Sequence, residues 1–216
     1  MYISLVCSLP FLYISFILSY TYYQFGNYQS QIHDLIVSNL DKNISGKFLD
    51  IGSGSGSLII KLAKNFPDSQ LFGINYWGSD WEYSKQQCEN NANIEGVSDR
   101  IEFIKASASN LPFKENEFDA VVSCLTFHEV KDEKNKLKII NEALRVLNPN
   151  GKFVLLDLFR EKKVFGEYNS FLHSLSELQN IKFEAINLES IIHLPTILKK
   201  RKVLGNAVIL KGIKIK

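Results

Sequence analysis

Along most of the chain, short apolar runs alternate with segments in which apolar residues recur every three or four positions. Ile32, Ile36 and Leu40 share one face of a predicted helix, whereas the run 118–124 is almost continuously apolar, as in a strand buried on both faces. The pattern predicts strands at 47–51, 70–74, 100–105, 118–124, 152–158, 181–188 and 203–213, and helices at 31–40, 58–66, 81–93, 134–147 and 167–179. This alternation is typical of an α/β fold whose mostly parallel sheet carries helices on both faces.

The beginning of the chain follows a different pattern. No Asp, Glu, Lys or Arg precedes Asp34, residues 1–25 include 18 apolar ones, and six of the nine tyrosines precede residue 29. A charge-free apolar stretch of at least about 18 residues predicts a transmembrane helix, with tyrosines at the headgroup level. A cleaved signal peptide needs basic residues ahead of its apolar core, and none occurs here. We expect a hydrophobic anchor at 1–25, with a buried or interfacial helix as the alternative, followed by one domain at 28–216.

Composition narrows the class of protein. The 216 residues suit one domain of ordinary size, and 45% apolar with 22% charged residues excludes a disordered chain. The net charge of +2 is too small to indicate a nucleic-acid partner. Three cysteines without a CxxC spacing indicate neither a disulfide scaffold nor a metal site, so we expect a reducing compartment and no bound metal.

The strand predicted at 47–51 ends in a glycine-rich turn that contains the first candidate chemistry. The candidate ligand-binding residues there are Asp50, Gly52, Ser53, Gly54 and Gly56. Their spacing fits neither the phosphate-binding P-loop nor the GxGxxG dinucleotide motif. A carboxylate at this strand tip repels a pyrophosphate but attracts an ammonium group. S-adenosylmethionine, which has an amino-acid end and a nucleoside end, fits this turn better than a nicotinamide dinucleotide does, so a nicotinamide-dependent oxidoreductase is a disfavoured alternative.

Several segments resemble the class I S-adenosylmethionine-dependent methyltransferases and a bacterial subgroup with N-terminal hydrophobic segments. They are 48–56, 73–78, 81–85, 111–113, 117–123, 127–130 and 142–151. The resemblance implies a Rossmann-like sheet of seven strands, the last one antiparallel, with S-adenosylmethionine as cofactor. It also implies further cofactor-binding residues at Asn75, Tyr76, Ser107, Ala108 and Ser123.

Two of these positions depart from the pattern of the resembled family. Asn75 stands where an acid is expected to hold the ribose hydroxyls, and Ser107 stands where an acid is expected to contact adenine. By analogy with hydrogen bonds to charged groups, each loss costs about 1–2 kcal/mol of binding. Together they correspond to a roughly ten- to thousandfold weaker affinity. A non-catalytic binding or scaffold protein with weakened cofactor affinity is therefore the second hypothesis.

The segment after the fourth predicted strand is expected to border the substrate. His128 is the candidate general base, because its ordinary pKa lies near neutrality; its alternative role is to pack beneath the site. Asp157, at the end of the fifth predicted strand, is a further candidate for the pocket rim, with a helix or turn cap before Arg160 as its alternative role. The sequence predicts a membrane-anchored methyltransferase that acts on a small molecule. If the anchor brings the enzyme to its substrate, that molecule is delivered from the membrane. The resemblance places its domain in the cytoplasm, where the cofactor is made.

Overall fold

A computed structural model describes residues 13, 15, 28–78, 84–178 and 181–215. Of the anchor predicted at 1–25, only residues 13 and 15 belong to this part of the chain. Residues 81–83 of the helix predicted at 81–93 also lie outside it. No helix within the described residues is long and apolar enough to cross a membrane. Residues 28–38 are helical, which confirms the helix predicted at 31–40.

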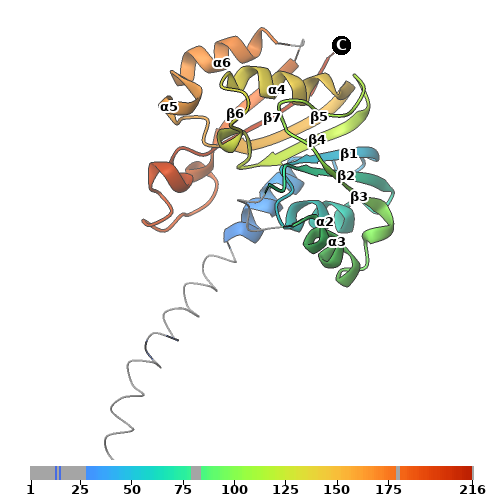
Figure 1. Ribbon diagram of the computed structural model, residues 1–216. Helices are drawn as coiled ribbons and strands as arrows, with labels where there is room; N and C mark the ends of the chain where they lie inside the picture. Colours follow the sequence, from blue (N-terminus) through green and yellow to red (C-terminus); the bar gives the residue numbers. More distant parts are fainter. Residues whose placement is uncertain (1–12, 14, 16–27, 79–83, 179–180, 216) are drawn as a thin grey trace, which may run out of the picture. The chain divides into compact units, whose positions relative to one another are not determined.

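Seven strands form one mixed sheet (Figure 1). They are β1 (Gly46–Ile51), β2 (Ser69–Asn75), β3 (Ile101–Lys105), β4 (Phe118–Cys124), β5 (Leu147–Asp157), β6 (Ile181–Asn187) and β7 (Val208–Lys214), in the order β3-β2-β1-β4-β5-β7-β6. Strands β1 to β5 pair in parallel, and β7 pairs antiparallel with both β5 and β6. The predicted seven-stranded, mostly parallel sheet with its last strand antiparallel is confirmed.

Helices cover both faces of this sheet (Figure 1). On one side lie α2 (Ser57–Asn65) and α3 (Lys85–Ile94); on the other lie α4 (Lys136–Arg145), α5 (Lys162–Phe165) and α6 (Tyr168–Ser176). The apolar side of α4 buries Ile139, Ile140, Ala143 and Leu144. Because both faces are covered, the inner strands are apolar throughout, and four consecutive residues of β4, 120–123, are buried.

In the second half of the chain the structure differs from the sequence pattern in the strands predicted at 203–213 and 152–158. Residues 201–205 form one π-helical turn, although the strand was predicted from 203. Strand β7 begins only at Val208, because Val208 pairs with Asn187, the last residue of β6. Strand β5 begins at Leu147, five residues early, because Leu147 pairs with Phe118 across a register shift. The short helix α5 had no prediction.

The carboxyl ends of β1, β2, β4 and β5 meet at one edge of the sheet, because these strands run parallel and are neighbours. Ligands of open α/β sheets bind beyond this edge, where the strand order reverses. Here the reversal falls between β1 and β4, since β2 and β3 lie to one side of β1 and the later strands to the other. The fold therefore brings the glycine turn after β1 and the segment after β4 to the same place.

Candidate functional site

A cavity of about 910 Å³ lies at these strand ends. Its described walls come from the turn after β1, the end of β2, residues 105–108 after β3 and the segment 124–132 after β4. Six of the residues proposed from sequence line it, namely Gly52, Gly54, Asn75, Tyr76, Ser107 and Ala108. The cavity therefore joins three motifs that are widely separated in the sequence.

The Asp50 carboxylate lies directly before the glycine turn and is almost fully buried, with 1% of the residue exposed. Neither of its carboxylate oxygens has a hydrogen-bond partner among the described residues. The nearby Ser53 hydroxyl donates instead to the backbone carbonyl of Asp50, at 3.2 Å. Burial raises the pKa of Asp50 to about 7. A buried carboxylate without donors is costly, so this one favours a cationic ligand at the adjoining turn.

The glycine turn lets the protein backbone come close to a ligand. At Gly52, with φ of +84°, a Cβ atom would lie 1.9 Å from the Thr126 hydroxyl oxygen. At Gly54, with φ of +53°, a Cβ atom would meet nothing within 4 Å, because the position opens to the cavity. The Gly54 carbonyl accepts hydrogen bonds from Trp77 Nε1 at 3.4 Å and from Cys88 Sγ at 3.0 Å. Two side chains thus hold the turn from behind, while its open side faces the cavity.

The end of β2 supplies the next part of the wall. Asn75 is the last residue of β2 and lines the cavity. Tyr76 follows it and is 58% exposed, with Lys105 Nζ 5.8 Å from its ring centroid. Trp77, by contrast, is buried and packs edge-on against Phe103. Tyr76 is therefore the aromatic ring available to a ligand, and Trp77 supports the turn.

Ser107 does not stand alone after β3. Its hydroxyl donates to the Asp132 carboxylate at 2.6 Å, and the Ser109 hydroxyl donates to the same oxygen at 2.7 Å. Asp132 belongs to the segment after β4 and also lines the cavity. The acid that the resembled family has after β3 is absent from this chain, but a carboxylate from another loop lies beside the serine that replaces it.

Besides Asp50, which is not among the described lining residues either, three residues proposed as cofactor ligands lie behind the wall of the cavity. Ser123 is fully buried in β4, and its hydroxyl donates to the Ile51 carbonyl at 2.8 Å. Ser53 and Gly56 shape the glycine turn, in which the Gly56 N–H donates to the Ser53 carbonyl at 2.7 Å. None of the three is among the lining residues that the structure describes. In this arrangement they support the residues that face the cavity.

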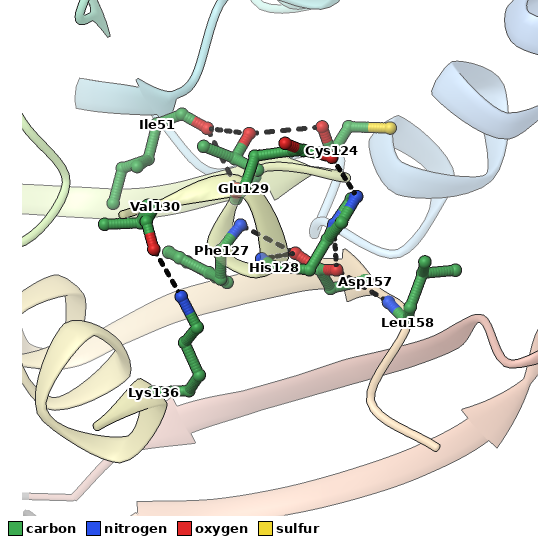
Figure 2. Close-up of polar contacts among 11 residues, drawn as sticks. Ile51, Cys124, Phe127, His128, Glu129, Val130, Lys136, Asp157 and Leu158 are labelled. Carbon is green, nitrogen blue, oxygen red and sulfur yellow. Dashed lines mark hydrogen bonds and ion pairs between the residues drawn. The ribbon is translucent and has the colours of Figure 1, made fainter. Parts of the chain in front are cut away.

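His128 is held between two carboxylates (Figure 2). Its Nδ1 lies 2.7 Å from Asp157 Oδ1, and its Nε2 lies 3.2 Å from Glu129 Oε1. Burial lowers the pKa of His128, but the hydrogen bond and charge of Asp157, aided by Glu129, outweigh burial and leave the pKa raised. Within the described residues Glu129 lines the cavity and His128 does not. The imidazole therefore links a buried carboxylate to one on the cavity wall.

Asp157 fixes the segment after β4 to the end of β5. Its carboxylate, with no exposed area, accepts backbone N–H bonds from Phe127 at 2.7 Å, His128 at 3.3 Å and Leu158 at 2.7 Å. The expected place of Asp157 on the pocket rim is wrong, because the side chain points to these donors beneath the wall. Thr126 and Glu129 line the cavity, as expected for the segment after the fourth predicted strand, whereas Asp132, which also lines it, was not predicted from sequence.

The comparison with protein families agrees with this site. Residues 49–155 match the model of the methyltransferase domain family. These residues are a class I S-adenosylmethionine-dependent methyltransferase domain. The ubiquinone/menaquinone biosynthesis C-methyltransferase UbiE of Rickettsia prowazekii is 36% identical to the chain over 137 residues, which cover 60% of this chain and 52% of that protein. The chain thus spans about half the length of the curated relatives it matches.

Solved structures share the fold of the methyltransferase domain. The YcgJ protein of Bacillus subtilis has a TM-score of 0.61 and 16% identity, covering 85% of this chain and 98% of that one. The geranyl diphosphate C-methyltransferase of Streptomyces coelicolor, solved with S-adenosyl-L-homocysteine, has a TM-score of 0.64 and 13% identity, covering 86% and 79%. At these identities the likeness concerns the fold.

The residues present in this methyltransferase domain fit S-adenosylmethionine. The unpartnered Asp50 carboxylate matches the ammonium group of the cofactor, and the open space at Gly54 leaves room for close backbone approach. Gly54 lines the cavity, whereas Asp50 is buried near the end of β1, four residues earlier, and is not among the described lining residues. The predicted cofactor therefore agrees with the structure as well as with the family.

The first prediction concerns Asp50→Asn in the cofactor-free protein. Between the ordinary aspartate pKa of 3.8 and the folded pKa of about 7, the folded state keeps a proton that the unfolded state has lost, so stability falls as pH rises. The difference between the two pKa values corresponds to about 4 kcal/mol. We expect Asp50→Asn to be more stable than wild type at pH 8 by up to about that amount, and nearly equal at pH 4, in urea unfolding.

The same substitution is expected to weaken S-adenosylhomocysteine binding at least about a hundredfold, because the ammonium group loses its carboxylate. The exposed Asp99, changed to Asn, serves as the control and is expected to alter neither stability nor affinity measurably. An Asp50→Asn protein that is less stable than wild type at pH 8 would show that Asp50 has a donor in the folded chain.

Proposed function

We propose that this protein transfers the methyl group of S-adenosylmethionine to a small molecule held in the cavity at the carboxyl ends of β1, β2 and β4. The observation that carries the proposal is the buried, unpartnered carboxylate of Asp50, two residues before Gly52, where the turn begins to line this cavity. A protein that bound phosphates here would place a negative charge against its own ligand. The family match and the UbiE relatives support a methyl-transfer reaction.

The residues that would hold the cofactor follow from their positions. Asp50 attracts the ammonium group, and the backbone at Gly52 and Gly54 permits close approach. The Asn75 amide offers one acceptor and one donor group to ribose hydroxyls, and the Tyr76 ring offers a face to an aromatic base. When bound, the cofactor supplies an electrophilic methyl group on a sulfonium.

The segment after β4 supplies the acceptor end of the cavity. Cys124, Leu125, Thr126 and Val130 form a mostly apolar wall, and the charged lining residues of the same segment are Glu129, Lys131 and Asp132. Methyl transfer needs alignment of the acceptor and, for many acceptors, removal of a proton. We assign the proton-accepting role to Glu129, since it reaches the cavity. His128, the base predicted from sequence, becomes a positioning residue that Asp157 holds in place and that fixes Glu129 through its Nε2.

The relatives indicate the class of acceptor. Their printed activity is C-methylation in ubiquinone and menaquinone biosynthesis. We propose a quinone precursor as the acceptor of this chain too, because the wall after β4 suits an apolar ring and Glu129 is placed to accept a proton from it. The methyl group would then move from sulfur to a ring carbon, and the ring proton would pass to the carboxylate.

A non-catalytic binding protein is the second candidate, and Asn75 is the observation that favours it. A neutral amide at the end of β2 lacks the charge that strengthens hydrogen bonds to ribose hydroxyls roughly twofold. This candidate predicts cofactor binding without turnover, whatever acceptor is supplied.

The second prediction tests cofactor binding and turnover with Gly54→Asp. Asp tolerates positive φ, and the position has open space, so we expect this variant to fold with normal stability in urea. Its side chain occupies the cavity, so S-adenosylhomocysteine affinity by calorimetry should fall at least about a hundredfold. Wild type should methylate a menaquinone precursor that lacks the ring methyl, and Gly54→Asp should not.

Gly96→Asp is the matched control, because Gly96 also has positive φ, at +69°, and open space, but does not line the cavity. It should bind and turn over like wild type. Equal affinity in the Gly54 and Gly96 variants would move the cofactor to another place. Tight binding by wild type without turnover on quinone precursors or other small acceptors would favour the non-catalytic candidate.

The third prediction concerns His128→Gln. Because the folded pKa of His128 is raised, its ion pairs stabilise the fold fully below the unfolded pKa near 6.5, and this stability is lost as pH rises through the folded pKa. The gap in free energy of unfolding between wild type and variant should therefore be larger at pH 6 than at pH 9. Turnover should fall about ten- to a hundredfold through kcat, with S-adenosylhomocysteine affinity unchanged, because Glu129 loses its partner.

His173→Gln is the control for this experiment, since His173 forms an exposed pair with Glu177 at 3.5 Å. Exposed pairs contribute little, so its stability gap should stay small at both pH values. A His128→Gln protein with unchanged kcat would remove His128 from any role in the reaction.

We also propose that residues 1–25 anchor the chain in a membrane, with the methyltransferase domain in the cytoplasm. The support is the charge-free stretch with 18 apolar residues, together with the cytoplasmic origin of the cofactor. An anchor of this kind brings the domain to quinone precursors, which partition into lipid.

The fourth prediction follows from this anchor. The full chain should stay in the membrane pellet after an alkaline carbonate wash. The double change Leu12→Arg with Ile14→Arg should release it, because each arginine at the centre of a span costs about 3 kcal/mol. Tyr13→Phe is the control and should remain in the pellet. Release of the wild-type chain by carbonate would contradict the anchor.

A further inference from the structure

Asp132 lies where two segments distant in sequence meet on the cavity wall. It follows the 3-10 turn η2 (Phe127–Glu129) after β4, whereas Ser107 and Ser109 follow β3. Asp132 and Ser107 both line the cavity, together with Lys105, Ala106 and Ala108. The contact between Ser107 and Asp132 thus joins the segment after β4 to the segment after β3 at the mouth of the cofactor site.

The hydrogen bonds at this contact leave the serine with no free proton. Ser107 Oγ donates to Asp132 Oδ2 at 2.6 Å and accepts from the Ser109 N–H at 3.2 Å. The Ser109 hydroxyl also donates to Asp132 Oδ2, at 2.7 Å. Since both hydroxyl protons point to one carboxylate oxygen, the group that this cluster presents to a ligand is an acceptor.

The carboxylate at this cluster carries its charge at neutral pH. Partial burial opposes ionisation of Asp132, but hydrogen bonds from the hydroxyls of Ser107 and Ser109 outweigh burial and lower its pKa. No lysine or arginine among the described residues forms an ion pair with it. The charge of Lys136 acts on Asp132 through space, and Lys105 and Lys131 line the same cavity. An ionised carboxylate bonds well to a neutral N–H donor and repels a carbonyl oxygen.

We infer that Asp132 is the residue that reads the exocyclic amine of the cofactor's purine. This inference rests on the proposed function, because it assigns one end of the cavity to the nucleoside and the turn at Asp50 to the ammonium group. A 6-aminopurine presents an N–H donor to the carboxylate, whereas a 6-oxopurine presents an acceptor. Ser107 and Ser109 orient the carboxylate. The chain thereby selects the base with an acid from the loop after β4.

The test compares S-adenosylhomocysteine with S-inosylhomocysteine, in which the amine is replaced by an oxo group. For the purified full chain, calorimetry should show at least about tenfold tighter binding of the adenosyl compound, because a site built for a donor rejects the analogue without it. In Asp132→Asn, whose amide can donate to the oxo group, this preference should fall to about unity or reverse.

The neighbouring Glu133 gives a matched control. Glu133 lies in the same loop but is not among the described lining residues, and it accepts the Asn135 N–H at 2.7 Å. Glu133→Gln should keep the wild-type preference for the adenosyl compound. Ser107→Ala, which removes one of the two orienting hydroxyls, should reduce the preference partly.

The outcomes separate this inference from the function on which it rests. Wild-type protein that binds neither nucleoside would overturn the proposed function itself. Wild-type protein that binds S-adenosylhomocysteine, together with an unchanged preference in Asp132→Asn, would overturn only the role of Asp132. If Asp132→Asn weakened the binding of both compounds equally, the role of Asp132 would likewise be overturned, since a general charge effect does not distinguish one base from another.

Discussion

Asp50 lies one residue before the end of the inner strand β1, with both carboxylate oxygens buried and, among the described residues, without a donor. A group of this kind destabilises the fold it belongs to, because burial favours its neutral form and its ordinary state in water is charged. The fold holds it there through backbone pairing on both sides, with Gly73 of β2 and Val122 of β4 as its register partners. If the proposed cofactor places its ammonium group against Asp50, that group would be the missing hydrogen-bond partner, and ligand binding would be coupled to folding stability at this residue.

The walls around this carboxylate depend on contacts between the ends of three strands. The Ile51 carbonyl accepts from Ser123 and from Thr126, which fixes the end of β4 to the end of β1. Asp157 then fixes the following segment to the end of β5 through three backbone donors and the His128 ring. The carboxylates of Asp50 and Asp157 are both buried, but they differ in their hydrogen bonding. Asp157 is bonded to three backbone N–H groups and the His128 ring, whereas Asp50 has no hydrogen-bond partner among the described residues.

The strands and the glycine turn could be predicted from the sequence because these features are local. A continuous apolar run predicts β4 within its own residues, and the order of the motifs implied the sheet topology. The partners of Ser107 and His128 lie 25 and 29 residues away, so no local pattern relates them. The π-helical turn at 201–205 was missed for a related reason. Val203 and Leu204 look like strand residues, but β6 ends at Asn187, opposite Val208, and offers them no partner.

The two departures from the family pattern, Asn75 and Ser107, differ in the loss of cofactor affinity that the contacts lead us to expect. Ser107 in place of an acid lowers cofactor affinity only if no other carboxylate reaches that part of the cavity. Asp132 lines the cavity there and accepts a hydrogen bond from Ser107. The cost of about 1–2 kcal/mol assigned to this position therefore drops out if Asp132 faces the base. Asn75 remains as one amide in place of one acid, which corresponds to roughly a tenfold change in affinity. A change of that size is compatible with a working cofactor site, whereas decay of function would be expected to leave Asp132 and Ser107 unmatched.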